Sequence, residues 1–389
     1  MTWLELDDAT LEARGGAFTA QEIARQPQCW RETIALLQSE GARIRAFLEP
    51  VLARPGIRVI LTGAGTSAYI GQCLLPQLLG RLPLRVEAIA TTDLVASPRT
   101  WFQRDVPTLL VSFARSGGSP ESVAAIDLAD QCLRDVQHLV VTCNAEGALY
   151  QACHARPRAL ALALPESTHD RGFAMTASFT SMLYAGLALM LGVGEAGASV
   201  AAVAAASERV LADACAGMRV LAGLAFQRVV FLGSGSLAGL AAEAALKVME
   251  LSDGQVATFS QSPLGFRHGP KAVVDRNTLV VLFMSGDALA ARYDLDLLRE
   301  LSGDDAAGAL LAMGTGEDPG LPDVAWLRVP SPSAGSGPAD DALLMFPYIA
   351  CAQMYAFFRS LELGRRPDAP NDSGVVNRVV RGVTLHGLG

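Results

Sequence analysis

The chain has 389 residues, a length typical of roughly two domains. Its residues are 51% hydrophobic and 18% charged, which predicts a large folded core and argues against a disordered chain. The net charge of −8 argues against nucleic acid as a partner, because a phosphate backbone requires a basic surface, but it does not exclude a small phosphate held by local amides and cations.

The cysteine pattern indicates a reducing compartment. The seven cysteines are odd in number, scattered and without C-x-x-C spacing, which argues against a disulfide framework or a zinc site. No cluster of His, Asp or Glu has metal-ligand spacing, and no signal peptide opens the chain. We therefore expect a cytoplasmic protein with no metal and no cofactor.

One uncharged stretch is long enough to span a bilayer. It lies between Arg171 and Glu195. Thr176, Ser178 and Thr180 interrupt its first half, so we expect a buried helix of a large α/β protein and no contact with a membrane.

The first domain is predicted from alternating strand and helix patterns. Residues 1–48 read as an amphipathic helical segment. Strands that alternate with helices are typical of a parallel sheet covered on both faces, so residues 49–200 are predicted to form an α/β domain. Its predicted strands are 57–62, 84–90, 108–113, 138–143 and 159–164.

The pattern then restarts. Gly233-Ser234-Gly235-Ser236 follows a β-type run, as Gly63-Ala64-Gly65-Thr66 does earlier, at an offset of 170 residues (233 minus 63). This internal repeat predicts a second α/β domain over residues 215–363, followed by an extended tail over 364–389. Its predicted strands are 228–232, 278–284, 309–313 and 324–329, with helices near 237–251 and 342–361.

The first glycine loop allows two interpretations. A strand followed by Gly63, Gly65 and Ala68 at the start of a helix is the outline of a dinucleotide fingerprint, and Glu87 lies 22 residues beyond Gly65. A nicotinamide enzyme is therefore an alternative, but this motif alone is weak evidence. The loop after the third strand favours a different ligand.

That loop is rich in serine and glycine. Ser116-Gly117-Gly118-Ser119 precedes a helix for which Ser119 is a candidate N-cap and Pro120 a candidate first residue. Converging amides, hydroxyls and the partial positive charge of a helix start suit a phosphate monoester. Loops after the first and third strands meet at the carboxyl edge of one sheet. An ordinary loop with a good cap is the alternative.

The chain has only two lysines, Lys247 and Lys271, among 31 basic residues. Lys247 and Glu250 share a helix face in small apolar surroundings, so a solvated surface ion pair, although possible, does not fit the sequence well. A carboxylate in such surroundings suits proton transfer. His268 lies between chain breakers and is expected on a loop, where a lone histidine is usually inert.

Four motifs follow one another along the chain: Gly63-Ala64-Gly65-Thr66-Ser67, Arg115-Ser116-Gly117-Gly118-Ser119-Pro120-Glu121-Ser122, Glu243-Ala244-Ala245-Leu246-Lys247 with Glu250-Leu251-Ser252, and Arg267-His268-Gly269-Pro270-Lys271. In this order they resemble the sugar isomerase (SIS) superfamily, and over residues 50–389 the chain is similar to the isomerase half of glucosamine-6-phosphate synthase. The segments 115–122, 173–176 and 376–384 resemble the galactosamine-6-phosphate deaminase/isomerase family, often labelled tagatose-6-phosphate ketose/aldose isomerase.

The resemblance implies two SIS domains, each a five-stranded parallel sheet between helices, in a homodimer or larger assembly. It implies that Glu250 moves a proton between C1 and C2, that His268 opens the sugar ring in the neighbouring subunit's site, and that Lys247 and Arg381 lie near the reacting atoms. The implied sugar-phosphate-binding residues are Gly65, Thr66, Ser67, Arg115, Ser116, Ser119, Ala174 and Met175.

The chain departs from the synthase pattern in ways that bear on the reaction. Ala114 replaces a serine, and Arg381 replaces the lysine that forms an imine, which arginine cannot form. Fewer than 50 residues precede the first domain, so no glutamine-hydrolysing domain fits there. We therefore expect loss of ammonia from galactosamine 6-phosphate to yield tagatose 6-phosphate. Another SIS isomerase or deglycase of a hexose 6-phosphate, or a non-catalytic sugar-phosphate-binding regulator, remains an alternative.

Overall fold

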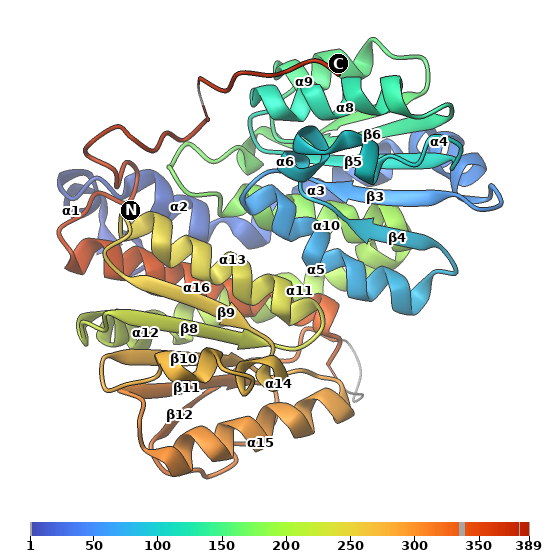
Figure 1. Cartoon of the computed structure of the whole chain (residues 1–389). Helices are drawn as coiled ribbons and strands as arrows, with labels where there is room; N and C mark the ends of the chain where they lie inside the picture. Colours follow the sequence, from blue (N-terminus) through green and yellow to red (C-terminus); the bar gives the residue numbers. More distant parts are fainter. Residues whose placement is uncertain (1, 334–338, 381, 389) are drawn as a thin grey trace. The chain divides into compact units, whose positions relative to one another are not determined.

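The computed structural model describes residues 2–333, 339–380 and 382–388 (Figure 1). The chain divides into two compact units, each built around one five-stranded sheet. The first-sheet unit comprises Cys29–Asp170, Ala177–Ala198 and Ser373–Gly389. The second-sheet unit comprises Met1–Gln28, Arg171–Thr176 and Ser199–Asp372.

All pairings in the first sheet are parallel, with the order β4-β3-β5-β6-β7. All five strands were predicted, with ends that differ by only a few residues. The chain leaves β3 toward β4 on one side and returns to β5 on the other, so the loops after β3 and β5 lie side by side at the carboxyl edge. The strands are β3 (Arg58–Thr62), β4 (Arg85–Ala88), β5 (Thr108–Ala114), β6 (Val136–Thr142) and β7 (Ala159–Ala163).

Helices cover both faces of this sheet, which explains why its central strands are buried throughout. Ile60 and Leu110 pack with α6, α8 and α9, whereas Phe113 lies against α10 on the opposite face. Helix α10 is buried from Ala177 to Met190, so the prediction of a buried apolar helix is confirmed. The helices of this unit include α4 (Gly41–Leu52), α5 (Thr66–Arg81), α6 (Thr91–Ala96), α7 (Pro98–Trp101), α8 (Pro120–Cys132), α9 (Ala148–His154), η1 (Glu166–Thr168) and α10 (Ala177–Leu191).

The second sheet is also fully parallel, with the order β12-β11-β10-β8-β9. Four of its strands were predicted and β9 was not. Strand β9 lies at the sheet edge, where exposed and half-buried residues alternate, so it lacks the continuous apolar run that marks a buried strand. The strands are β8 (Arg228–Gly233), β9 (Ala257–Gln261), β10 (Thr278–Phe283), β11 (Ala309–Gly314) and β12 (Val324–Arg328).

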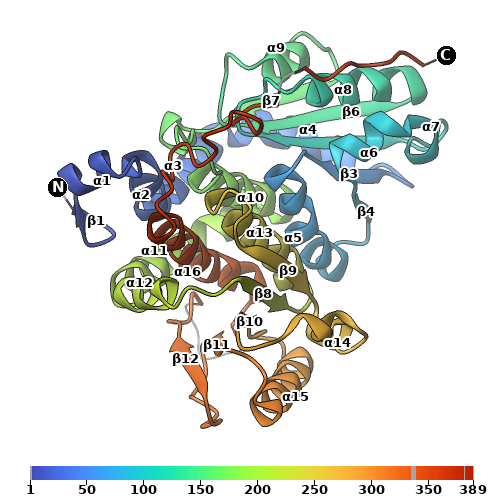
Figure 2. The ribbon, with the colours of Figure 1, turned by 60° about the vertical axis from the view of Figure 1, so that its left-hand side comes forward.

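Two layers of helices flank the second sheet. Helices α13 and α16 lie on one face, where the Phe283 and Tyr348 rings stack at 5.5 Å, and α14 and α15 lie on the other, where Phe266 joins the core (Figure 2). Both sheets are thus three-layer α/β structures, as predicted for two SIS domains. The helices here are α1 (Asp8–Ala13), α2 (Ala17–Ala24), α12 (Cys215–Gly223), α13 (Ser236–Leu251), α14 (Pro263–Phe266), η2 (Pro270–Val273), α15 (Ala288–Asp304) and α16 (Asp341–Glu362).

The remaining elements are short or belong to both units. Strands β1 (Thr2–Trp3) and β2 (Leu6–Asp7) form a hairpin, while α3 (Gln26–Ser39) and α11 (Val193–Asp213) each contribute residues to both units. The tail after α16 contains turns but no helix or strand in its described residues.

Helix α16 passes a length and composition test for a membrane span, and no other described helix does. The most apolar window of α16 is 89% buried inside the protein, as in the core helix of a large domain, so the test is weak evidence for a span.

Candidate active site

Helix α13 carries the predicted acid–base residues. It begins directly after Gly235, whose positive φ of 56° turns the chain from β8 into the helix, and its Ala- and Leu-rich sequence has high helix propensity. It packs against β8, β9 and α16, which buries most of its surface. Positions 243, 247 and 250 are one turn apart and therefore share one face.

Lys247 lies between two carboxylates. Its side chain is 0% exposed, its Nζ atom is 3.4 Å from Oε1 of the equally buried Glu243, and it donates a hydrogen bond to Oε2 of Glu250. The Glu250 side chain is 25% exposed, so it is the accessible member of the three. The interpretation as a solvated ion pair is therefore excluded. Glu243 was not predicted as a functional residue, although its i−4 spacing from Lys247 was visible in the sequence.

His268 is exposed on the loop between α14 and η2, as its flanking breakers predicted. Its backbone N–H donates to the oxygen of Gly265 at 3.0 Å, and Gly269 follows with a φ of 115°, a conformation that favours glycine. The imidazole makes no hydrogen bond to the residues that the structure describes. It is therefore available to a ligand or a second subunit.

In the first-sheet unit, the glycine loop after β3 is tightly packed. A Cβ atom at Gly63 would lie 2.5 Å from the backbone of Ser67, and Gly65 has a positive φ of 56°. This close approach places buried Thr66 and Ser67 in the first turn of α5, beside exposed Gly65. The loop after β8 has the same geometry, because Gly235 also has a φ of 56° and a Cβ at Gly233 would lie 2.4 Å from Leu237.

We expect Gly63→Ala to raise the KM for a phosphorylated substrate and to lower stability by about 1–3 kcal/mol, because the added methyl group forces the strand away from α5. Steady-state kinetics and urea unfolding would measure both effects. Gly80→Ala, in the helix α5 that follows this loop and with open space at its Cβ, is the matched control and should neither raise the KM nor lower the stability. Unchanged kinetics in Gly63→Ala would contradict the assignment.

The second loop, after β5, is braced by its neighbours. The side-chain amide of Asn144 donates to the backbone oxygen of Ser116 at 2.9 Å, and Gly117 has a positive φ of 60°. Pro120 is the first residue of α8, as predicted. Ser119 occupies the N-cap position, but its hydroxyl donates to Glu121 and makes no capping hydrogen bond, which corrects the predicted side-chain cap.

Arg115 connects this loop to the C-terminal tail. Its Nη2 atom donates to the backbone oxygen of Arg378 at 2.8 Å, and the Arg378 guanidinium donates to the backbone oxygen of Asp170. Burial lowers the pKa of the half-buried His169, and the positive charges of Arg378 and Arg115 lower it further. The sequence assigned no role to His169, and the structure places it in this cationic cluster.

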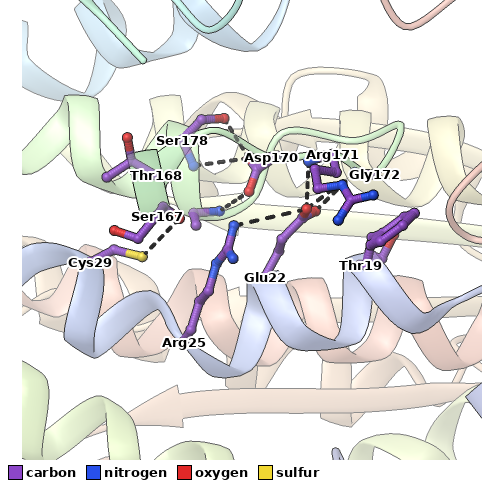
Figure 3. A network of polar contacts seen from close by, with 12 residues as sticks. Thr19, Glu22, Arg25, Cys29, Ser167, Thr168, Asp170, Arg171, Gly172 and Ser178 are labelled. Atoms are coloured by element: carbon purple, nitrogen blue, oxygen red, sulfur yellow. Dashed lines mark hydrogen bonds and ion pairs between the residues drawn. The ribbon is translucent and has the colours of Figure 1, made fainter. Parts of the chain in front are cut away.

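The segment that contains Ala174 and Met175 is fixed at its start. Figure 3 shows the Glu22 carboxylate directed at the backbone N–H groups of Arg171 and Gly172, to which it is hydrogen bonded. Ala174 and Met175 are buried members of the second-sheet unit. The sequence offered no signal for this contact, because Glu22 is about 150 residues away.

Asp170, whose role the sequence left open, caps helix α10. Its carboxylate accepts from the backbone N–H groups of Ala177 and Ser178 at 3.1 and 2.9 Å (Figure 3). Because Asp170 is fully buried and bound in this way, its role is structural.

The predicted residues thus fall into two sets. The structure brings the six loop residues to the carboxyl edge of the first sheet, and it places Lys247, Glu250 and His268 in the second-sheet unit. Arg381 lies outside the described residues. The six loop residues are Gly65, Thr66, Ser67, Arg115, Ser116 and Ser119.

The corresponding loops of the second sheet are occupied by the chain's own carboxylates. Ser234 Oγ and the Ser285 N–H donate to Asp294 at 2.7 and 2.9 Å, and Ser285 Oγ and the Gly286 N–H donate to Asp341, both at 2.6 Å. These donors are therefore not available to a phosphate, which supports assigning the phosphate site to the first-sheet unit alone.

Burial raises the pKa of Asp294 from 3.8 to about 6, and it also raises the pKa of Asp341. Because the pKa of Asp294 is higher in the folded state than in the unfolded state, the folded state holds the proton more tightly. The stabilisation from protonated Asp294 is therefore fully present below about pH 4 and is lost as the pH rises through 6.

We expect the unfolding free energy of the wild type, relative to Asp294→Asn, to fall by about 2–3 kcal/mol between pH 4 and 7. Urea unfolding of both proteins across this range would measure it. The asparagine changes the hydrogen bonds by an amount that does not depend on pH. The prediction is therefore tested by how the difference in unfolding free energy, wild type minus variant, changes with pH. A difference that rises with pH would contradict it.

Among residues 2–333, 339–380 and 382–388, no group of three or more His, Cys, Asp or Glu side chains could hold a metal ion.

No family model matches the chain. The solved structure of tagatose-6-phosphate ketose/aldose isomerase from Escherichia coli is 38% identical, covers 98% of each chain and has a TM-score of 0.88. The C-terminal domain of glucosamine-fructose-6-phosphate aminotransferase from Francisella tularensis, at 16% identity, covers 90% of this chain and 98% of that chain with a TM-score of 0.75, which shows the fold alone. Two parallel sheets with paired glycine loops therefore define a protein with two SIS domains, of the phosphosugar isomerase class.

D-galactosamine-6-phosphate deaminase AgaS from Shewanella sp. (strain ANA-3) is 41% identical to this chain over 386 residues, which cover 98% of this chain and 95% of that protein. The chain belongs to the D-galactosamine-6-phosphate deaminase AgaS family.

Proposed function

We propose that this protein converts galactosamine 6-phosphate to tagatose 6-phosphate and ammonia. The observation that carries the proposal is a partly exposed carboxylate, Glu250, hydrogen bonded to a fully buried lysine on a chain 41% identical to a deaminase of this specificity. Such a carboxylate is suited to move a proton on a bound sugar.

The phosphate group binds the two loops at the carboxyl edge of the first sheet. Thr66 and Ser67 contribute hydroxyls at the start of α5, and Ser116 and Ser119 contribute hydroxyls ahead of α8. The two helix starts add partial positive charge. Arg115, the first residue of the second loop, adds a positive charge, and its side chain donates to the backbone oxygen of Arg378.

The reaction proceeds through the open-chain sugar. His268 of a second subunit assists ring opening, and Glu250 removes the proton from C2 and returns it at C1. The positive charge of Lys247 stabilises the charge that develops on the enolamine and holds the Glu250 carboxylate. The resulting C2 ketimine adds water and releases ammonia. Ala174, Met175 and Arg381 are further residues that we assign to the substrate site.

We also propose a cytoplasmic homodimer. All seven cysteines are free thiols, which supports a reducing compartment. The exposed imidazole of His268 supports a role in the site of a partner subunit.

Ammonia release measured across a panel of hexosamine 6-phosphates, with fructosamine 6-phosphate included, tests the proposal. We expect galactosamine 6-phosphate to have the highest kcat/KM. A preference for fructosamine 6-phosphate would identify a deglycase instead. Saturable binding of all sugars with no ammonia release would identify a regulator.

A further inference from the structure

We propose that Glu300 is a positioning residue for His268. The proposal rests on the role of His268 in the proposed function and extends it to helix α15, from which no residue has so far been assigned to catalysis.

The loop is anchored on its amino-terminal side by the core. Phe266, two residues before His268, is fully buried in one cluster with Leu297, Leu298 and Leu301 of α15. The loop therefore sits directly on α15. The backbone next turns at Gly269, so His268 lies at the tip while its neighbours face the helix.

One residue on each side of His268, Arg267 in the loop and Lys271 in η2, binds the same carboxylate. Arg267 Nε is 2.8 Å from Oε2 of Glu300, and Lys271 Nζ donates to Oε1 of the same side chain. Lys271 Nζ is also 2.5 Å from Oδ2 of Asp304, one turn further along α15. The hydrogen bond from Lys271 lowers the pKa of Glu300, so the carboxylate is charged at neutral pH.

These contacts explain why position 271 is a lysine and not an arginine. A compact ammonium group can contact two carboxylates on successive turns of one helix, whereas a planar guanidinium is suited to paired contacts with one. Arg267 and Lys271 thus both bind Glu300, and Lys271 also binds Asp304. We call this set of ion pairs the bridge.

The bridge contributes little to the free energy of unfolding of the protein. All four side chains are partly exposed, and exposed ion pairs of this kind contribute little to folding. Their geometric effect is larger, because they restrain both ends of a loop whose exposed tip carries the imidazole. A displacement of about 1 Å in a catalytic group can cost about 10²-fold in rate.

Glu300→Ala tests the proposal against Asp296→Ala as the matched control. Asp296 lies one turn earlier on α15 and forms its ion pair with Arg299, at 3.3 Å, and not with Arg267 or Lys271. We expect Glu300→Ala to lower the kcat/KM for ammonia release by roughly tenfold and Asp296→Ala to leave it unchanged. Glu300→Gln, which keeps one acceptor oxygen, should give a smaller loss.

The same substitutions in a His268→Asn background separate positioning from general damage. We expect Glu300→Ala to cause no further loss there, since the group that it positions is already absent. An equal loss in both backgrounds, or no loss in either, would overturn the proposal. If His268→Asn alone keeps full activity, the assigned role of His268 fails instead.

Amide hydrogen exchange of the full-length protein provides a readout that does not depend on activity. We expect Glu300→Ala to accelerate exchange in the peptide covering residues 266–271, and Asp296→Ala to leave it at the wild-type rate. Unchanged exchange in Glu300→Ala would show that the ion pairs do not restrain the loop, and the inference would fail even if the protein is a deaminase.

Discussion

Glu250→Gln should reduce ammonia release from galactosamine 6-phosphate by roughly 10³-fold or more while the protein stays folded. Glutamine has the same shape but cannot accept the C2 proton, and general acid–base groups of this kind contribute about 10²- to 10⁴-fold to a rate. Steady-state kinetics would measure the loss, and circular dichroism with urea unfolding would establish that the fold is kept.

Glu362→Gln is the matched control for this experiment. Glu362 is the exposed last residue of α16, in the same unit, and it has no role in the proposed mechanism. We expect its substitution to leave both kinetics and stability unchanged. Wild-type activity in Glu250→Gln would rule out the proton transfer on which the proposed function depends.

Lys247→Met should have a different effect, because it damages the fold as well as the reaction. The buried Glu243 carboxylate would lose the cation 3.4 Å away, and removal of one partner from a buried ion pair costs about 3–5 kcal/mol. We also expect a large loss of kcat, because Glu250 would lose the hydrogen bond that holds it. Urea unfolding and ammonia release would measure the two effects.

The double variant Glu243→Gln/Lys247→Met separates the effect of Lys247 on stability from its effect on activity. With both charges removed, no ionised group remains buried behind Glu250, and most of the lost stability should return. Activity should stay low, since Glu250 still lacks its lysine. Recovery of activity together with stability would mean that Lys247 serves only the fold.

Most of the architecture could be predicted from local patterns. Four of the interior strands, β3, β5, β8 and β10, are short apolar runs next to glycine loops, and a helix buried on all sides, α10, reads as an uncharged stretch. Strand β9 was missed for the converse reason. An edge strand with polar, exposed positions has no apolar run, and only its pairing with β8 defines it as a strand.

The sequence identified candidate site residues only where they lie close together in the chain. Rare residue types and close spacing pointed to Lys247 and Glu250, because one helix carries them, whereas the role of His268 was implied only by the family resemblance. Contacts between distant positions could not be found in this way. Glu22 binds the backbone of residues 171 and 172, and Glu300 binds both sides of His268, yet neither has a local signal.

The sequence by itself determined the fold class of this protein. Two strand–glycine–helix motifs at a fixed offset require close backbone approach, which only glycine allows, so they specify two similar parallel sheets. Tertiary structure alone decided that the second pair of glycine loops is filled by the chain's own carboxylates. The side chains that fill the second pair, Asp294 and Asp341, come from later helices and reach their donors only after the chain has folded.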